Sequence, residues 1–316
     1  MRIGLAIPTL NADRDSTWLD TLTAIFERQS LLPESTVVID SGSKDRTVEM
    51  CRSYPVQVHE IPKARFDHGG TRNLALDLLG DVDIAIFLTQ DSEPNDPETF
   101  QRIVDGILSG DKIAATFGRQ IPRHNASLFA KHARLYNYPA SSRSYSLEDR
   151  TAHGLKTIFL SNSFSAYRVD FLRSVGGFST PMIFGEDMLA AAKLLKAGKS
   201  IFYNASAVVR HSHNYTLAQE FSRYFDVAVF YSQNSWLRKE FGGASVAGRD
   251  FVASELNYLK TERAMALPEA IARTCFKYSG YLSGKRSHAL PNTICRKLSM
   301  NKGYWDQTPD RNQLNG

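Results

Sequence analysis

The sequence predicts an α/β fold in which a mostly parallel central sheet is flanked by helices. Apolar segments of strand length alternate with helical segments over residues 3–91, which is the pattern of an open parallel sheet. Polar residues follow several of the apolar segments where each one ends. The expected strands are 3–10, 37–39, 56–61 and 83–91, and the expected helices are 18–30, 47–54 and 68–80.

Each element has its own signal in the sequence. In the segment 18–30, Leu19, Leu22 and Ile25 recur at helical spacing and share one face. A Gly/Ser/Asp turn closes the second strand, and Gly80 closes the helix that starts near residue 68. The segment 83–91 is apolar almost throughout, as expected for a strand covered on both faces.

The later elements are less regular. We expect a strand at 113–122, a polar excursion without periodicity at 123–156, and a strand followed by a short helix within 158–178. A helix is expected at 185–198 and two short strands at 200–216, and the pattern turns helical from about residue 217.

Composition limits the class of protein. The chain has 316 residues, 42% of them hydrophobic, a net charge of +5 and three cysteines. The cysteines, at 51, 275 and 295, are too sparse for a disulfide framework or a zinc cluster, which favours a reducing compartment. No segment approaches 18 apolar residues and the N-terminus lacks a secretory pattern, so we expect a cytoplasmic protein, which could rest on a membrane.

The polar residues after the strands form the first candidate site, because ligands of parallel sheets bind beyond the carboxyl ends of the strands. These residues are Thr9, Asn11, Asp40, Ser41, Asp91 and Glu93. A lone Asp at a strand end is most often a turn former or helix cap. Here Asp91 follows an apolar strand, so it is also a candidate ligand of a divalent cation that carries a diphosphate.

Three further motifs are candidates for contacts with an anionic ligand, a proton or a metal. In "HGGTRN", Arg72 could pair with phosphate or belong to a plain glycine turn. In "FGEDM", Glu186 and Asp187 could be simple charges at a helix start, or a base that deprotonates an acceptor hydroxyl. His211 and His213 share one face of a strand, as metal ligands or as structural residues.

These motifs together resemble the inverting glycosyltransferases of family two, which have the Rossmann-like GT-A fold. The resemblance covers roughly residues 1–240 and rests on five motifs in order. They are "AIPTLN", "VVIDSGSKDRT", "TRN", "TQDSEP" in the place of the Asp-x-Asp motif, and "GGF…FGEDM". More narrowly, "FDHGGTRN", "FGRQIP", "NSFSAYR" and "HSHNYT…QEFSRYFD" look like bacterial rhamnosyltransferases of O-antigen and related polysaccharide assembly.

The resemblance implies roles for individual residues. Asp187, beside Glu186, would be the catalytic base, and Asp91 would hold Mg²⁺ or Mn²⁺ together with His211. The implied donor-binding residues are Thr9, Asn11, Asp40, Ser41, Arg72, Gln90 and Asp91. The implied donor is dTDP-L-rhamnose, the acceptor is a saccharide that could be lipid-linked, and the reaction is a single displacement that inverts the anomeric centre.

Two departures from the family pattern matter. Thr89 stands where the first Asp of Asp-x-Asp is usual, so metal binding would depend more on Asp91 and His211. Ser41 stands where many members have a second acid, which weakens any transfer of a uracil contact. Because the donor is implied by resemblance alone, donors linked to UDP or GDP, and a non-catalytic nucleotide-sugar-binding module, remain alternatives. No G-x-G-x-x-G follows the first strand, which disfavours a dinucleotide oxidoreductase.

The last part of the chain, 241–316, is expected to be a basic helical extension of a catalytic domain at 1–240. Residues 260–302 carry nine Lys or Arg and two Glu, a balance of +7. The extension could pack on the catalytic domain as a solvated appendage or bind an anionic membrane surface. Nucleic acid is not an expected partner, because no recognition motif of that kind is present.

Overall fold

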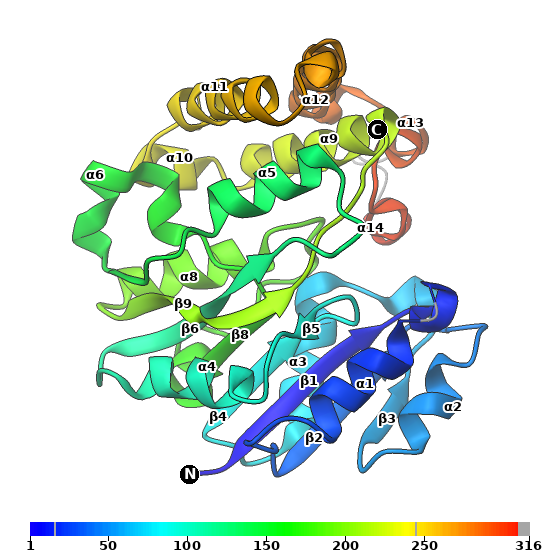
Figure 1. The fold of residues 1–316 in the computed structure, drawn as a ribbon, viewed down its shortest axis with the longest axis vertical. Coiled ribbons are helices and arrows are strands. Elements are labelled where there is room, and N and C mark those ends of the chain that lie inside the picture. Colours follow the sequence, from blue (N-terminus) through cyan, green and yellow to red (C-terminus); the bar gives the residue numbers. More distant parts are fainter. Residues whose placement is uncertain (16, 244, 309–316) are drawn as a thin grey trace, which may run out of the picture.

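The computed structural model describes residues 1–15, 17–243 and 245–308. Within these ranges one sheet holds nine strands in the order β3-β2-β1-β4-β8-β6-β9-β5, with β7 paired to β9 (Figure 1). The strands β1 to β4 are parallel neighbours, as the sequence predicts. Their bounds are Ile3–Thr9 (β1), Ser35–Asp40 (β2), Gln57–Glu60 (β3) and Ile84–Leu88 (β4).

The other half of the sheet mixes directions. Strand β8 (Phe164–Arg168) runs antiparallel to β4 and to β6 (Ile113–Ile121), whereas β6 and β9 (Ser200–Arg210) are parallel. The short strands β5 (Glu93–Pro94) and β7 (Arg143–Tyr145) pair antiparallel with β9. Six of the nine strands in the described residues therefore point the same way, which confirms the mostly parallel sheet.

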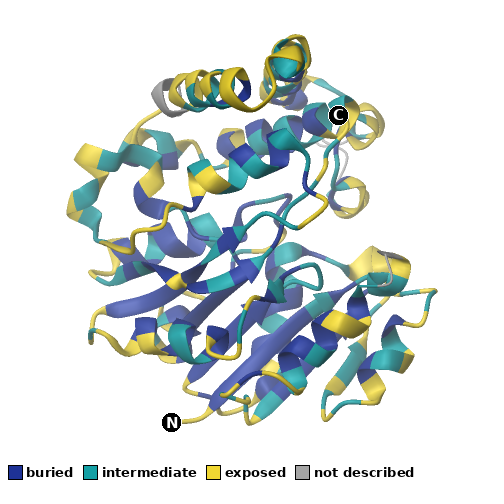
Figure 2. Ribbon diagram, viewed as in Figure 1, coloured by how far each residue is buried: buried dark blue, intermediate teal, exposed yellow. Residues whose placement is uncertain are grey.

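Helices cover both faces of the sheet. On one face, α1 (Trp18–Phe26) and α4 (Thr99–Leu108) pack in one apolar cluster; on the other, α3 (His68–Leu79) and α8 (Glu186–Lys196) pack in a second. Figure 2 shows the strands between these layers as almost entirely buried. Two short helices, α2 (Thr47–Arg52) and α7 (Val169–Ser174), complete the layers.

Two expectations about local structure were wrong. The segment expected as a polar excursion contains helix α5 (Leu128–Asn137), strand β7 and helix α6 (Arg150–His153). The hydroxyl of Ser127 caps α5 by accepting the N–H of Ala130. The helix was missed because one of the positions it buries is the polar residue His132, which interrupts the apolar spacing in the sequence. The segment 200–216 contains one long strand, β9 (Ser200–Arg210), in place of two short ones, so His211 and His213 lie just beyond the strand and not on it.

A bulge explains why β9 reads as two strands. Gly118 pairs with Asn204, but the next residue of β6, Arg119, pairs with Val208, so residues 205–207 are extra on β9. The bulge comes so close to β6 that a Cβ on Gly118 would lie 2.6 Å from the carbonyl oxygen of Ala207. A glycine is therefore needed at 118.

The C-terminal region is helical, as expected. Figure 1 shows α9, α11 and α12 stacked on one side of the molecule, while α13 and α14 return toward the sheet. The bounds are Leu217–Gln233 (α9), Ser235–Phe241 (α10), Ser245–Glu262 (α11), Leu267–Lys285 (α12), Asn292–Leu298 (α13) and Lys302–Gln307 (α14). Among the described residues, none of these helices combines the length and apolarity needed to cross a bilayer.

The C-terminal helices share the core of the sheet. Gly280 and Gly284 of α12 lie against α9, where an added Cβ would be 2.2 Å from the carbonyl oxygens of Phe221 and Phe225. Tyr304 and Trp305 belong to the same buried cluster as α3 and α8. The division into domains 1–240 and 241–316 stays a prediction, but its two parts pack as one body around this cluster.

Candidate active site

The ends of β1 and β2 form a rigid corner around Asp40. The buried Asp40 carboxylate accepts hydrogen bonds from the Thr9 hydroxyl (3.0 Å) and from the backbone N–H groups of Gly42 (2.9 Å) and Ser43 (2.8 Å). Ser41, also buried, donates its N–H to the carbonyl of Thr9. These bonds hold the turn after β2 against the end of β1, so Asp40 shapes the corner where a nucleotide is predicted to bind.

Asn11 and Gln90 fasten the neighbouring loops. Asn11 adopts a positive φ of 49°, and its side-chain oxygen accepts the N–H of Lys44 at 2.8 Å. The amide of Gln90 accepts the N–H of Leu10 (2.7 Å) and donates to the carbonyl of Leu10 (3.2 Å). Gln90 thus joins the ends of β1 and β4, which places Asp91 beside the corner.

Asp91 faces two histidines across the sheet edge. One of its carboxylate oxygens lies 3.3 Å from Nε2 of His211 and 3.5 Å from Nε2 of His213, and the other accepts the Thr89 hydroxyl at 2.7 Å. One ligand atom from each of Asp91, His211 and His213 falls within 4.8 Å of the other two. The carboxylate and His213 are about one-third exposed, whereas His211 is buried.

The tautomer of His211 follows from its other neighbour, Gln120. Arg134, which can only donate, bonds Oε1 of Gln120 at 2.6 Å, so that atom is the amide oxygen. Nδ1 of His211 lies 2.7 Å from the same oxygen and must therefore carry the proton. The lone pair of His211 is then on Nε2 and points at Asp91, as in a metal-binding histidine that is oriented by an outer hydrogen bond.

The charge states agree with this geometry. Burial lowers the pKa of His211 despite the opposing effect of Asp91, and it lowers the pKa of His213 to about 3. Both imidazoles are therefore neutral near pH 7 and offer lone pairs. When the ring proton of His213 is on Nδ1, three lone-pair atoms converge, and this set fits a divalent cation with Asp91, His211 and His213 as its protein ligands.

Glu186 and Arg72 form a buried ion pair on the opposite side of the site. Nη1 of Arg72 lies 3.1 Å from Oε1 of Glu186, and each side chain is 6% exposed. The same nitrogen donates to the carbonyl of His68, and Asn162 donates its side-chain N–H to Glu186 at 3.2 Å. Burial would raise the pKa of Glu186, but Arg72 and His68 outweigh it and lower that pKa. In this structure Arg72 forms an ion pair with Glu186. A contact between Arg72 and the donor stays a prediction.

Asp187 is the second residue of α8, directly after Glu186, and is positioned by backbone N–H groups. It accepts the N–H of Asn162 at 3.1 Å and that of Met188 at 2.8 Å. Burial, followed by the negative charge of Glu186, raises the pKa of Asp187 to about 7. A partly exposed carboxylate with that pKa can accept a proton near neutral pH.

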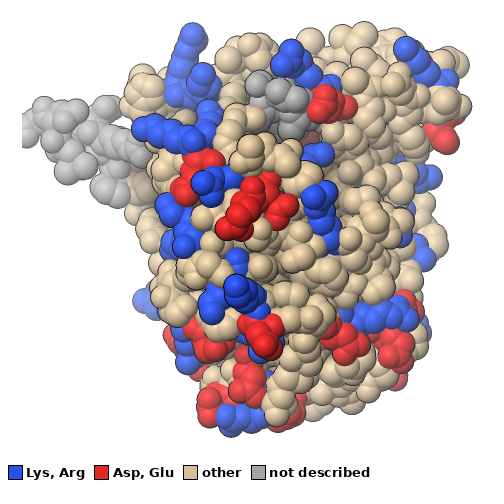
Figure 3. Space-filling model, turned by 90° about the vertical axis from the view of Figure 1, so that its left-hand side faces the viewer, with Lys and Arg blue, Asp and Glu red and all other residues tan. Residues whose placement is uncertain are grey.

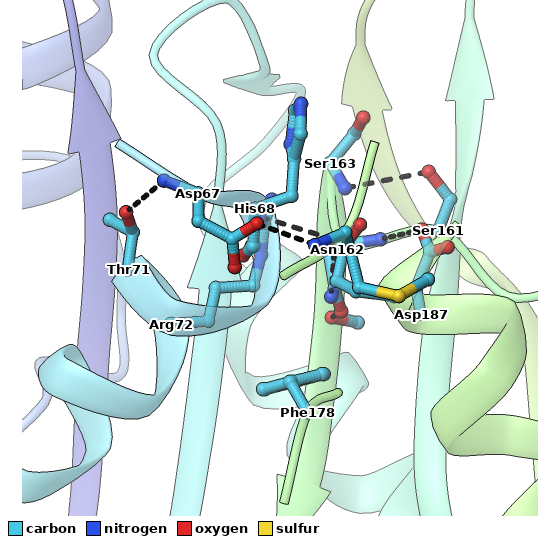
Figure 4. Close-up of polar contacts among 12 residues, drawn as sticks. Asp67, His68, Thr71, Arg72, Ser161, Asn162, Ser163, Phe178 and Asp187 are labelled. Atoms are coloured by element: carbon cyan, nitrogen blue, oxygen red, sulfur yellow. Dashed lines mark hydrogen bonds and ion pairs between the residues drawn. The ribbon is translucent and has the colours of Figure 1, made fainter. Parts of the chain in front are cut away.

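The segment 161–163 connects the two sides. Figure 4 shows Arg72 and His68 coming from the start of α3 and Asp187 from the start of α8, with Asn162 between them. The carbonyl of Ser163 accepts the N–H of Thr89, whose hydroxyl bonds Asp91, while the Ser161 hydroxyl accepts a bond from Gln120. The carboxylate–histidine cluster and Asp187 therefore flank one short segment at the carboxyl edge of the sheet.

Comparison with known proteins identifies the family. Residues 5–176 match the sequence profile described as glycosyl transferase family 2, which is more than half of the chain. The chain belongs to glycosyl transferase family 2. It is 43% identical over 307 residues to an O-antigen chain rhamnosyltransferase, RfbN, of Salmonella typhimurium, a match that covers 97% of this chain and 96% of the relative.

A second sequence relative and a solved structure are also similar to this family 2 glycosyltransferase. The O-antigen chain rhamnosyltransferase WbaN of Salmonella anatum is 40% identical over 302 residues, covering 96% of this chain and 95% of the relative. Among solved structures, the mannosyltransferase PcManGT of Pyrobaculum calidifontis, in complex with GDP-Man and Mn²⁺, matches with a TM-score of 0.60. It is 17% identical and covers 91% of this chain and 87% of that one, so it supports the fold, and the predicted GT-A architecture is confirmed.

Sequence reasoning missed several residues that shape the site. Gln120 lies inside β6, one residue before the strand ends, so a rule that selects residues following a strand passes over it. Asn162 lies in the "NSFSAYR" motif but precedes an antiparallel strand, where that rule does not apply. His68 was seen only as part of a glycine turn, although its carbonyl anchors Arg72.

Proposed function

We propose that this family 2 glycosyltransferase moves L-rhamnose from dTDP-L-rhamnose to a saccharide acceptor, with inversion, in the assembly of a bacterial O-antigen. The names of two relatives, at 43% and 40% identity over nearly the whole chain, support rhamnosyl transfer. The observation that carries the mechanism is the pairing of a carboxylate–histidine cluster with the carboxylate of Asp187 across the segment 161–163.

Asp187 would act as the general base. An acceptor hydroxyl that approaches the anomeric carbon from the side opposite the diphosphate would lose its proton to the Asp187 carboxylate. The N–H groups of Asn162 and Met188 hold the carboxylate in a fixed orientation. Burial and the negative charge of Glu186 raise the pKa of Asp187 to about 7. No covalent intermediate is needed, so one base suffices, and a β-linked donor would give an α-linked product.

Asp91, His211 and His213 would hold the metal. A divalent cation bound there supplies positive charge that stabilises the departing nucleotide diphosphate. Because two of the three ligand atoms are imidazole nitrogens, and Mg²⁺ is usually bound by oxygen alone, we propose Mn²⁺ in preference to Mg²⁺. Thr89, in the position of the missing first Asp, contributes by orienting the Asp91 carboxylate.

A donor screen tests the proposed function. Nucleotide release would be measured with dTDP-rhamnose, UDP-galactose, UDP-GlcNAc and GDP-mannose, with Mn²⁺, with Mg²⁺ and after chelation, in the presence of a lipid-linked saccharide. We expect turnover of dTDP-rhamnose that requires a divalent cation. Turnover of a UDP or GDP sugar alone would replace the donor assignment. Binding of a nucleotide sugar without any turnover would support a non-catalytic binding module.

The raised pKa of Asp187 predicts how the rate depends on pH. The base must be ionised, so the transfer rate should fall as the pH drops through about 7 and should level off above it. Other titratable or charged groups facing Asp187 are Glu186, Arg72, Tyr138 and Tyr167. In the Glu186→Gln variant the neighbouring negative charge is lost, so the falling limb of the pH–rate profile should move to lower pH. If the falling limb does not move in this variant, it reports the titration of a group other than Asp187.

We also propose that α12 contacts an anionic membrane surface that presents the acceptor. Ile271, Cys275, Tyr278 and Leu282 recur at helical spacing on its exposed side, and Ile271 and Tyr278 are 60% and 63% exposed. Lys285 and Arg286 follow this stripe, and each basic residue near an anionic leaflet adds about 1 kcal/mol. On the flank shown in Figure 3, by contrast, Lys and Arg are interspersed with Asp and Glu.

Vesicle flotation checks the membrane contact. The protein should float with vesicles that contain phosphatidylglycerol more than with phosphatidylcholine alone, and salt should weaken this binding. The double variant Ile271→Ser, Leu282→Ser should lower the partition coefficient at least about tenfold, since two apolar side chains, each worth about 1.5–3 kcal/mol when fully buried, no longer insert. Leu19→Ser on α1, where Leu19 is 52% exposed, is the matched control and should change nothing. Equal flotation of all three proteins would contradict the proposal.

A further inference from the structure

The segment after α13 reaches back into the candidate active site. The side-chain Nδ2 of Asn301 donates a hydrogen bond of 2.7 Å to the carbonyl oxygen of Ile183. Ile183 lies two residues before Gly185, the residue with φ of 77° from which α8 and its carboxylates Glu186 and Asp187 begin. The path of the chain into α8 is therefore held from a residue that is 118 positions away.

The other end of the Asn301 amide contacts His68. Because Nδ2 donates to a carbonyl, the remaining atom is the oxygen Oδ1, and it lies 3.3 Å from Nε2 of His68. Nε2 must then carry the proton in this contact. The carbonyl of His68 in turn accepts Arg72, which pairs with Glu186. One amide side chain thus bridges the start of α3 and the loop before α8.

Asp226 of α9 holds this amide in place. Its buried carboxylate accepts the backbone N–H groups of Met300 and Asn301, each at 3.0 Å. The loop before α8 has a second anchor at Asp67, which accepts the N–H of Met182 at 2.6 Å. Loss of Asn301 would therefore loosen the loop without releasing it from the fold.

We propose that Asn301 is a positioning residue for the catalytic carboxylates: it fixes the loop before α8 relative to His68 and so sets where Asp187 meets the acceptor hydroxyl. This inference rests on the proposed function, in which Asp187 is the base. It assigns to the C-terminal region a part in the active site that its sequence does not suggest. A static misplacement of a catalytic group by about 1 Å can cost about 10²-fold in rate.

The test compares Asn301→Ala, Asn301→Asp and Gln307→Ala in the full chain. Gln307 is the matched control, because its amide also ties the C-terminal segment to distant carbonyls, those of Ala64 and Phe66, but does not touch the loop before α8. Asn301→Ala should lower kcat at least about tenfold with little change in the KM for the donor. Asn301→Asp keeps an acceptor for His68 but places a carboxylate oxygen against the carbonyl oxygen of Ile183, so its kcat should fall at least as far as that of Asn301→Ala.

Two further measurements separate positioning from simple loss of stability. Hydrogen exchange of residues 179–188 should accelerate in Asn301→Ala and stay unchanged in Gln307→Ala at equal Tm, and the pH–rate profile should shift only in the Asn301 variants. Wild-type kcat, pH profile and exchange in Asn301→Ala would overturn the inference. If the wild-type chain turns over no donor, the proposed function fails instead, and the exchange of 179–188 still decides whether Asn301 holds the loop.

Discussion

Asp187→Asn is expected to lower the rate of sugar transfer by about 10²–10⁴-fold while donor binding stays within about twofold of wild type. Asn keeps the size of the side chain, but its single oxygen can accept only one of the N–H groups of Asn162 and Met188, which donate to different oxygens of Asp187. The ion pair between the neighbouring Glu186 and Arg72 is unchanged, so the start of α8 should stay in place. What the variant loses is the ability to take a proton at neutral pH. Single-turnover transfer and calorimetric binding of the donor would measure the two effects separately.

The matched control is Asp170→Asn, which makes the same chemical change in the first turn of α7 at an exposed position. That variant should transfer sugar at the wild-type rate. If Asp187→Asn instead weakened donor binding and left the rate of the bound complex unchanged, the base would have to be sought elsewhere, with Glu186 as the nearest carboxylate. A transfer rate unaffected by Asp187→Asn would remove the acid–base assignment altogether.

Asp91→Ala is expected to abolish the dependence of donor binding on a divalent cation. The cluster would lose its one anionic ligand and retain two imidazoles, so metal affinity should fall by at least about 10²-fold and donor affinity should approach that of the chelated wild-type enzyme. Titration with Mn²⁺, followed by calorimetry or by the paramagnetic relaxation of water, gives the metal affinity without any reference to turnover.

Glu93→Ala is the control for the loss of a carboxylate at this edge of the sheet. Glu93 lies two residues further along, on β5, outside the cluster of ligand atoms. The Glu93→Ala variant should keep wild-type metal affinity. His211→Ala should resemble Asp91→Ala, because it removes the imidazole nitrogen that Gln120 orients toward Asp91. Unchanged Mn²⁺ binding in Asp91→Ala would show that the metal binds elsewhere.

The first half of the fold could be read from the sequence because its signals are local. Strands β1, β2 and β4 are continuous apolar runs that end in polar turns, and Gly80 marks the end of α3. The second half depends on tertiary contacts that no short window contains. Helix α5 buries His132 between aromatic rings, and β9 carries a bulge whose partner is Gly118 on another strand.

The site divides in the same way. Asp91 was predicted from its place at a strand end, Asp187 from its place at a helix start, and His211 from the His-x-His spacing, and the structure brings all three to one edge of the sheet. Pairing between side chains could not be predicted. The ion pair of Arg72 with Glu186, which gives that buried carboxylate a partner, has no signal in the sequence, and the contact of Arg72 with an anionic ligand stays a prediction.

The bulge at residues 205–207 has a consequence for how this chain tolerates insertions and deletions. Side chains along a strand alternate between its two faces, so a change of one residue in the bulge reverses the facing of every position that follows. After such a deletion β9 would be one residue shorter and would keep its apolar character, but the imidazole of His211 would turn away from Gln120. The three small bulge residues, Ala205, Ser206 and Ala207, thus determine which face of β9 the later side chains occupy. Loss or gain of one of them should disable the enzyme while leaving a folded protein.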